Sequence, residues 1–109
     1  MNALINETKK IKNKLKFSNL MTLFKQKIED CIINDKAIVV NVSNSFMAFR
    51  NTMHIADYEI DDERLYLNDE NFEIHLNLHK IKDIEYDNMY EECFILLHND
   101  NTEIYFCFL

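Results

Sequence analysis

The sequence predicts an α+β fold in which an N-terminal helical segment packs on an antiparallel meander sheet of about five or six strands. Apolar residues recur at helical spacing in residues 1–36, and the period changes to two in residues 37–109. The chain also has no glycine and no proline. Asn and Asp, which tolerate the left-handed backbone region, must therefore form its turns.

The first third of the chain predicts one helix or two. Four residues recur at helical spacing among lysines: Leu4, Thr8, Ile11 and Leu15. Ser18 has the position of an N-cap for a second helical segment, and Asn34–Asp35 can end that segment. The sequence leaves open whether residues 3–34 form one kinked helix or two.

The remaining two thirds predict strands separated by polar breaks. Strand character is found in Ala37–Ser43, Phe46–Ile60 (one long strand or two short ones), Arg64–Leu67, Phe72–Leu78 with pairing continuing past Lys82, Cys93–His98 and Thr102–Leu109. The breaks are Asn44–Ser45, Asp61–Glu63, Asn68–Asn71, Asp87–Glu92 and Asn99–Asn101.

The last two strands form a hairpin with two candidate registers. A two-residue turn at Asp100–Asn101 pairs His98 with Glu103, and we favour it because it gathers apolar residues on one face. That face holds Cys93, Ile95, Leu97, Ile104, Phe106 and Phe108. A three-residue loop instead pairs Cys93 with Cys107.

Length and composition bound the class of protein. A chain of 109 residues predicts a single domain, 1–109, with a helical and basic part at 1–36 and an antiparallel, acidic part at 37–109. We expect no membrane span and no signal peptide. Three cysteines in apolar surroundings, Cys31, Cys93 and Cys107, predict reduced thiols in a cytoplasmic protein. The abundance of Lys, Asn and Ile beside two Arg and no Trp indicates an A+T-rich genome, which favours a bacterial host cell. Segment Tyr105–Leu109 lies either inside the sheet or at an edge that allows a homodimer.

The formal net charge of −7 is unevenly distributed. Residues 1–37 carry +4 and residues 38–109 carry −11. An acidic region repels nucleic acid and favours basic partners, although acidic surfaces also serve solubility alone. Lysines in Lys9–Lys16 fit binding to nucleic acid, a membrane surface or an acidic partner, but a solvated helix face is the simpler interpretation.

Enzyme and metal chemistry find little support in the sequence. The histidines are His54, His75, His79 and His98, and they include no tight pair typical of structural zinc sites. Cys93 and Cys107 fall in apolar strand runs, and no glycine-flanked serine is present. Paired carboxylates fall at expected turns. We therefore predict a non-enzymatic protein without a metal or cofactor.

One segment resembles a known family. Arg50–Asn51 with His54, then Phe72–Leu76, then the hairpin around Asn99–Asn101 resemble the repeated sheet of haem-utilisation proteins of the HemS and ChuX type, over roughly sixty residues. The resemblance implies haem binding, with His54 or His75 as the iron ligand. The succession of predicted strands and turns from Leu65 to Phe106 also fits a pleckstrin-homology-like adaptor module.

The leading functional prediction is an inhibitor or neutraliser that binds a basic, nucleic-acid-handling protein. Phage anti-defence proteins, nucleic-acid mimics, antitoxins and immunity proteins belong to this class. Carboxylates on strands and turns can occupy sites that a partner uses for phosphates. The predicted partner-binding residues are Asp61, Asp62, Glu63, Asp69, Glu70, Glu73, Asp87, Glu91 and Glu92.

Overall fold

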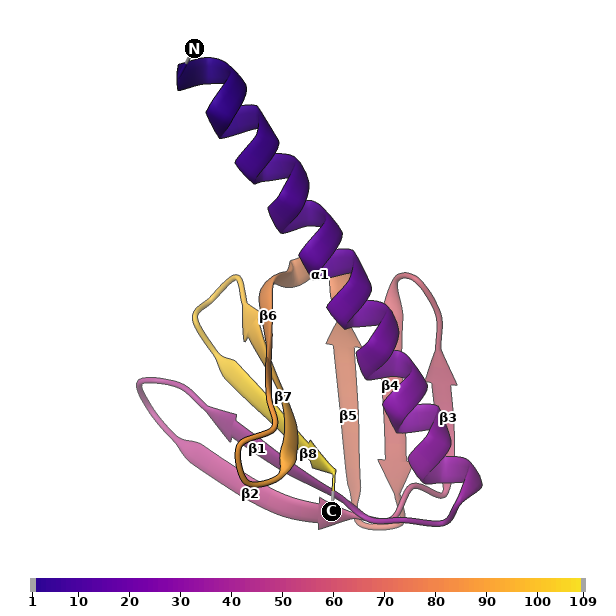
Figure 1. The fold of residues 1–109 in the computed structure, drawn as a ribbon. Coiled ribbons are helices and arrows are strands. Elements are labelled where there is room, and N and C mark those ends of the chain that lie inside the picture. The colour runs from indigo at the N-terminus through magenta and orange to yellow at the C-terminus, as the bar shows by residue number, and fades with distance from the viewer. Residues whose placement is uncertain (1, 109) are drawn as a thin grey trace.

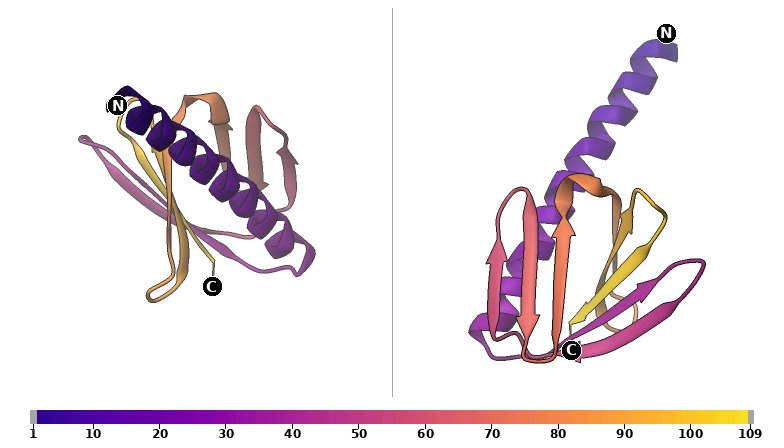
Figure 2. Two further views of the ribbon diagram at one scale, coloured as in Figure 1. Left: turned by 45° about the horizontal axis from the view of Figure 1, so that its top comes forward. Right: turned by 180° about the vertical axis from the view of Figure 1, so that it is seen from behind.

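One long helix crosses two antiparallel sheets. The computed structural model describes the backbone of residues 2–108 and the side chains of residues 15–108. Helix α1 (Asn2–Ile33) lies on one side of both sheets, and its N-terminal half extends beyond them (Figures 1 and 2). The predicted α+β class with an N-terminal helix is confirmed. The side chains of Leu4, Thr8, Ile11 and the lysines at 9–14 lie outside the described residues.

The strands number eight and form two sheets, where the sequence predicts five or six in one meander. The larger sheet has the order β2-β1-β8-β7-β6, with β1 (Ile38–Ser43), β2 (Ala48–Met53), β6 (Ile81–Asp87), β7 (Glu92–His98) and β8 (Glu103–Phe108). The smaller sheet has the order β3-β4-β5, with β3 (Asp57–Ile60), β4 (Arg64–Asp69) and β5 (Phe72–Asn77). A 3₁₀ turn at Leu78–Lys80 joins β5 to β6.

Helix α1 is continuous and ends in a Schellman motif. Ser18 is not an N-cap, because its carbonyl accepts the Thr22 hydroxyl inside the helix at 3.0 Å. At the other end Asp35 takes φ 51°, the left-handed conformation that glycine usually supplies. The Lys36 amide then donates to the Cys31 carbonyl at 2.8 Å, and the Asp35 amide donates to the Ile32 carbonyl at 3.2 Å. The predicted stop at Asn34–Asp35 is confirmed.

The turns rely on Asn and Asp side chains, as the absence of glycine predicts. In each case a side-chain oxygen accepts a backbone N–H two residues further on, which closes a local turn. The residues that do so in hairpin turns are Asn44, Asp61, Asp69, Asp87 and Asp100.

The core forms where α1 packs on the larger sheet. Met21, Phe24, Ile28 and Cys31 lie on one helical face and are buried. The Phe24 ring is fully buried, with its centroid 4.9 Å from the ring of Phe106 and 5.5 Å from that of Phe94. Leu65, Leu67 and Ile74 of the smaller sheet belong to the same cluster.

The hairpin of β7 and β8 adopts the register that we did not favour. Leu97 pairs with Glu103 and Cys93 with Cys107, across a three-residue loop closed by a bond from the His98 amide to the Thr102 carbonyl at 2.9 Å. Asn101 supplies the left-handed residue of this loop, at φ 69°. The shift by one residue turns Phe94 and Leu96 into the core and Cys93, Ile95 and Leu97 outward.

Two further predictions depend on this register. The prediction of three reduced thiols is wrong for Cys93 and Cys107, which form a disulfide because the strands place them directly opposite each other, whereas Cys31 is free and buried. Strand β8 pairs with β1 on one side and β7 on the other. It therefore lies inside the sheet and offers no edge to a second copy, which removes the predicted route to a homodimer.

Candidate protein-binding face

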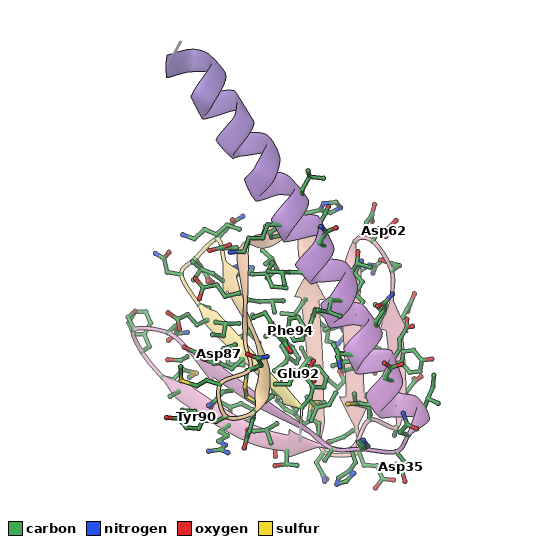
Figure 3. The ribbon with its side chains drawn as sticks, viewed as in Figure 1. Asp35, Asp62, Asp87, Tyr90, Glu92 and Phe94 are labelled. Carbon is green, nitrogen blue, oxygen red and sulfur yellow. A yellow bond between two sulfur atoms is a disulfide. The ribbon has the colours of Figure 1, made fainter. Side chains whose placement is uncertain are left out.

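The nine carboxylates predicted to bind a partner do not form one patch. Three lie in the β3–β4 turn (Asp61, Asp62 and Glu63), three lie at or after the β4–β5 turn (Asp69, Glu70 and Glu73), and three surround the β6–β7 turn (Asp87, Glu91 and Glu92). The first two turns are at opposite ends of β4, and the third belongs to the other sheet. Figure 3 shows Asp62 well separated from Asp87 and Glu92.

Two of the nine form ion pairs with lysines of α1. Lys27 Nζ lies 2.9 Å from Glu92 Oε1, and this contact holds the pKa of Lys27 above its ordinary value. Lys25 Nζ lies 3.7 Å from Asp62 Oδ1. A coherent acidic surface must therefore be sought elsewhere in the sheets.

Such a surface lies on the outer face of the larger sheet, the face turned away from α1. Asp83, Glu85 and Asp87 alternate along β6 opposite Leu97, Ile95 and Cys93 of β7. On β8, Glu103 pairs with Leu97 and Tyr105 with Ile95. Because side chains alternate between faces, these residues point away from the buried Ile84, Phe94 and Leu96. We call this surface the acidic face; it consists of Asp83, Glu85, Asp87, Cys93, Ile95, Leu97, Glu103 and Tyr105. Of its four carboxylates, only Asp87 is among the nine residues predicted to bind a partner.

A shallow hollow forms the centre of the acidic face. It has a volume of about 230 Å³ and is lined by Asp83, Glu85, Ile95, Leu97, Glu103 and Tyr105. The Tyr105 hydroxyl donates to Glu103 Oε2 at 2.7 Å. That hydrogen bond, then burial and the charges of Glu103 and Glu85, raise the pKa of Tyr105. The Tyr105 phenol therefore stays protonated near neutral pH.

Among the described side chains, residues 15–108, none of Asp83, Glu85, Asp87 and Glu103 forms an ion pair. Three of them, Asp83, Glu85 and Glu103, line the hollow beside Ile95 and Leu97, which makes a site suited to a basic side chain with an aliphatic stem.

The outer face of the smaller sheet carries a second polar cluster. The hydrogen bonds of Glu73 Oε1 with Asn68 Nδ2 (2.9 Å) and of Glu73 Oε2 with His75 Nε2 (3.2 Å) lower the pKa of Glu73, and the contact with His75 is the larger cause. The ring of Tyr66 lies 4.7 Å from that of His75. Tyr66, Glu73 and His75 line an open hollow of about 610 Å³.

This second hollow does not suit haem. Its lining includes Glu59, Arg64, Glu73 and Asn77, whereas a haem site is largely apolar. His75 is held by Glu73, and His54 follows β2 in the other sheet. The structure therefore places the two candidate iron ligands on, or directly after, strands of different sheets.

No family model and no curated protein matches the chain. Within the described residues, no helix combines the length and the apolar character that a membrane crossing requires.

Sequence reasoning missed three residues of the hollow, Asp83, Glu85 and Glu103. The alternation of Asp83, Glu85 and Asp87 was a usable signal, because residues two apart on a strand share a face. The outward position of Ile95 and Leu97 was hidden, since it follows from the hairpin register.

Proposed function

We propose that this chain is a small non-enzymatic binding protein that neutralises a basic, nucleic-acid-handling protein through the acidic face. The observation that supports this proposal is the hollow, where Asp83, Glu85 and Glu103 surround an apolar floor without a cationic partner among residues 15–108. An inhibitor of this kind belongs to the anti-defence, nucleic-acid-mimic, antitoxin or immunity class.

An arginine or lysine of the partner is the side chain that fits the hollow best. Its methylene stem covers Ile95 and Leu97, and its charged group donates hydrogen bonds to the surrounding carboxylates. The Tyr105 ring adds a surface on which a guanidinium can stack. Arginine is favoured over lysine, because its planar group has five donors for several carboxylates at once.

The position of the hollow beside an open sheet edge favours an extended partner segment. Strand β6 is an edge of the larger sheet, so its outer backbone groups have no neighbouring strand. Carboxylates on such an edge repel acidic or identical chains. A basic extended segment meets no such repulsion and can follow β6 with alternate side chains directed at the acidic face.

Binding of a short labelled peptide of alternating arginine and threonine, measured by fluorescence anisotropy over a NaCl series, tests the proposal. The triple variant Asp83→Asn/Glu85→Gln/Glu103→Gln should bind at least about 10-fold more weakly, which corresponds to about 1.4 kcal/mol. The matched control Asp62→Asn/Glu63→Gln/Glu70→Gln removes the same charge from the turns of the smaller sheet and should bind nearly as the native chain does.

Equal losses in the two variants would show that net charge alone attracts the peptide, and the acidic face would then have no special role. An affinity that does not fall with rising salt would also contradict the proposal, because the attraction between exposed charges is screened.

A further inference from the structure

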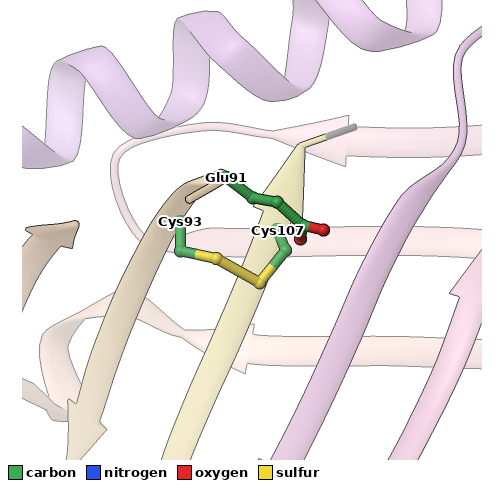
Figure 4. Close-up of side chains that lie close together, drawn as sticks. All are labelled: Glu91, Cys93 and Cys107. Atoms are coloured by element: carbon green, nitrogen blue, oxygen red, sulfur yellow. A yellow bond between two sulfur atoms is a disulfide. The ribbon is translucent and has the colours of Figure 1, made fainter. Parts of the chain in front are cut away.

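The disulfide of Cys93 and Cys107 lies beside the carboxylate of Glu91. The two cysteines pair directly across β7 and β8, with Cα atoms 4.2 Å apart. Both sulfur atoms and a Glu91 carboxylate oxygen lie within 4.8 Å of one another. Figure 4 shows the Glu91 side chain extending over the disulfide toward Cys107. Among the described side chains this is the one group of three close potential metal ligands.

We propose that the reduced forms of Cys93 and Cys107, together with Glu91, bind a thiophilic divalent cation of the Zn²⁺ type. Two thiolates and one carboxylate match the donors that zinc accepts in tetrahedral sites, and the fourth position is left for water. The cysteines come from two hydrogen-bonded strands, so the backbone holds both sulfur atoms on one face before the metal arrives.

The alternation of β7 explains why Glu91 is available. Glu92 turns to the helix side, where it contacts Lys27 at 2.9 Å and accepts the Tyr86 hydroxyl at 3.1 Å. Glu91, one residue earlier, is on the side of Cys93 and forms no hydrogen bond or ion pair within residues 15–108. Asp87, which pairs with Cys93 from β6, adds a second negative charge that favours a cation.

The disulfide and the metal are alternative uses of the same sulfur atoms. A dithiol reductant transfers two electrons and two protons to the disulfide, the S–S bond breaks, and the reductant is itself oxidised to a disulfide. Binding of the cation then forms two metal–sulfur bonds and releases the two thiol protons. The site is therefore open to a metal only in the reduced protein. This inference does not depend on the proposed partner.

Titration of the full chain with Co²⁺ tests the site, since thiolate-to-cobalt charge-transfer absorption reports sulfur ligation directly. The TCEP-reduced chain should develop this band at one equivalent and lose it on addition of Zn²⁺. Glu91→Gln should weaken binding about 10-fold or more. Cys31→Ser is the matched control and should leave the band unchanged, because Cys31 is buried elsewhere.

Three outcomes would overturn the proposal: no charge-transfer band in the reduced chain, a band of equal strength in the oxidised chain, or loss of the band in Cys31→Ser. Cys107→Ser should abolish the band. Circular dichroism of each reduced variant confirms that it is folded, and Glu91→Gln keeps both cysteines, so its weaker binding reports ligation even if Cys107→Ser unfolds.

Discussion

The phenol of Tyr105 donates to the carboxylate of Glu103 over 2.7 Å, from two residues that share the outer face of β8. This bond fixes one carboxylate oxygen of Glu103 at the wall of the hollow. It is also the largest cause of the raised pKa of Tyr105. Titration of the Tyr105 phenol therefore reports on the contact that shapes the acidic face.

Glu103→Gln should lower the pKa of Tyr105 toward its ordinary value, because the variant removes both the strongest hydrogen-bond acceptor and a nearby negative charge. A pKa raised by folding stabilises the native state below the ordinary pKa of tyrosine, about 10, and this contribution is lost as the pH rises through the native pKa. Tyrosine Cζ chemical shifts over an alkaline titration measure the change. An unchanged pKa would show that the bond is not formed in solution.

Phe24→Ala should lower the free energy of unfolding by about 3–5 kcal/mol. The ring is fully buried between Phe94 and Phe106, so its removal leaves a cavity between α1 and the larger sheet. Leu15→Ala is the control, since Leu15 on the same helix is 58% exposed, and it should change stability by less than about 0.5 kcal/mol. Urea unfolding measures both variants. Similar losses of unfolding free energy in Phe24→Ala and Leu15→Ala would contradict the packing of α1 on the larger sheet.

The sequence predicts the local structure better than the pairing of strands. Helical spacing in Met21, Phe24 and Ile28, and alternation in Phe72–Asn77, appear directly in the residues because each reports a single element. The assignment of Ala48–Met53 and Asp57–Ile60 to different sheets does not. It depends on β8 pairing with β1, a contact between residues 60 to 70 positions apart, from Ser43 paired with Glu103 to Ile38 paired with Phe108.

The candidate site was less predictable than the fold. Charge counts located the acidic two thirds of the chain but not the acidic face, because turns rich in carboxylates dominate the count. Both faces of Cys93–His98 are apolar, so hydrophobicity alone did not choose which face is buried. The left-handed conformation of Asn101 decided the loop length, and with it the exposure of Ile95, Leu97 and the disulfide.

Asp35→Gly should stabilise the chain by about 0.5–1 kcal/mol. Asp35 has φ 51° at the end of α1, where glycine has no steric cost, and the substitution also removes a negative charge from the negative end of the helix dipole. Asp35→Val should destabilise by about 1–2 kcal/mol, because a β-branched residue is strained in this conformation. Equal midpoints of urea unfolding for the two variants would contradict the Schellman geometry.

Asp61→Asn should reduce stability at neutral pH but not at low pH. The Asp61 carboxylate accepts the amides of Arg64 and Glu63, both at 2.7 Å, and these bonds hold its pKa below the ordinary value. A lowered pKa contributes stability above the ordinary pKa of aspartate, and that contribution is lost as the pH falls through the native pKa. The difference in melting temperature between native chain and variant should therefore narrow below about pH 4. A difference in melting temperature that stays constant with pH would exclude a role for the charge of Asp61.

Reduction of the disulfide should lower the free energy of unfolding by about 3 kcal/mol. Cys93 and Cys107 are separated by 14 positions, and closing a loop of about 15 residues removes conformational entropy of this size from the unfolded chain. Urea unfolding of the native chain with and without a reductant measures the effect. Cys31→Ser should show the same dependence on reductant, because the free Cys31 takes no part in the bond, whereas Cys93→Ser/Cys107→Ser should show none. An unfolding midpoint of the native chain that does not change with the reductant would mean that the two cysteines are not joined in solution.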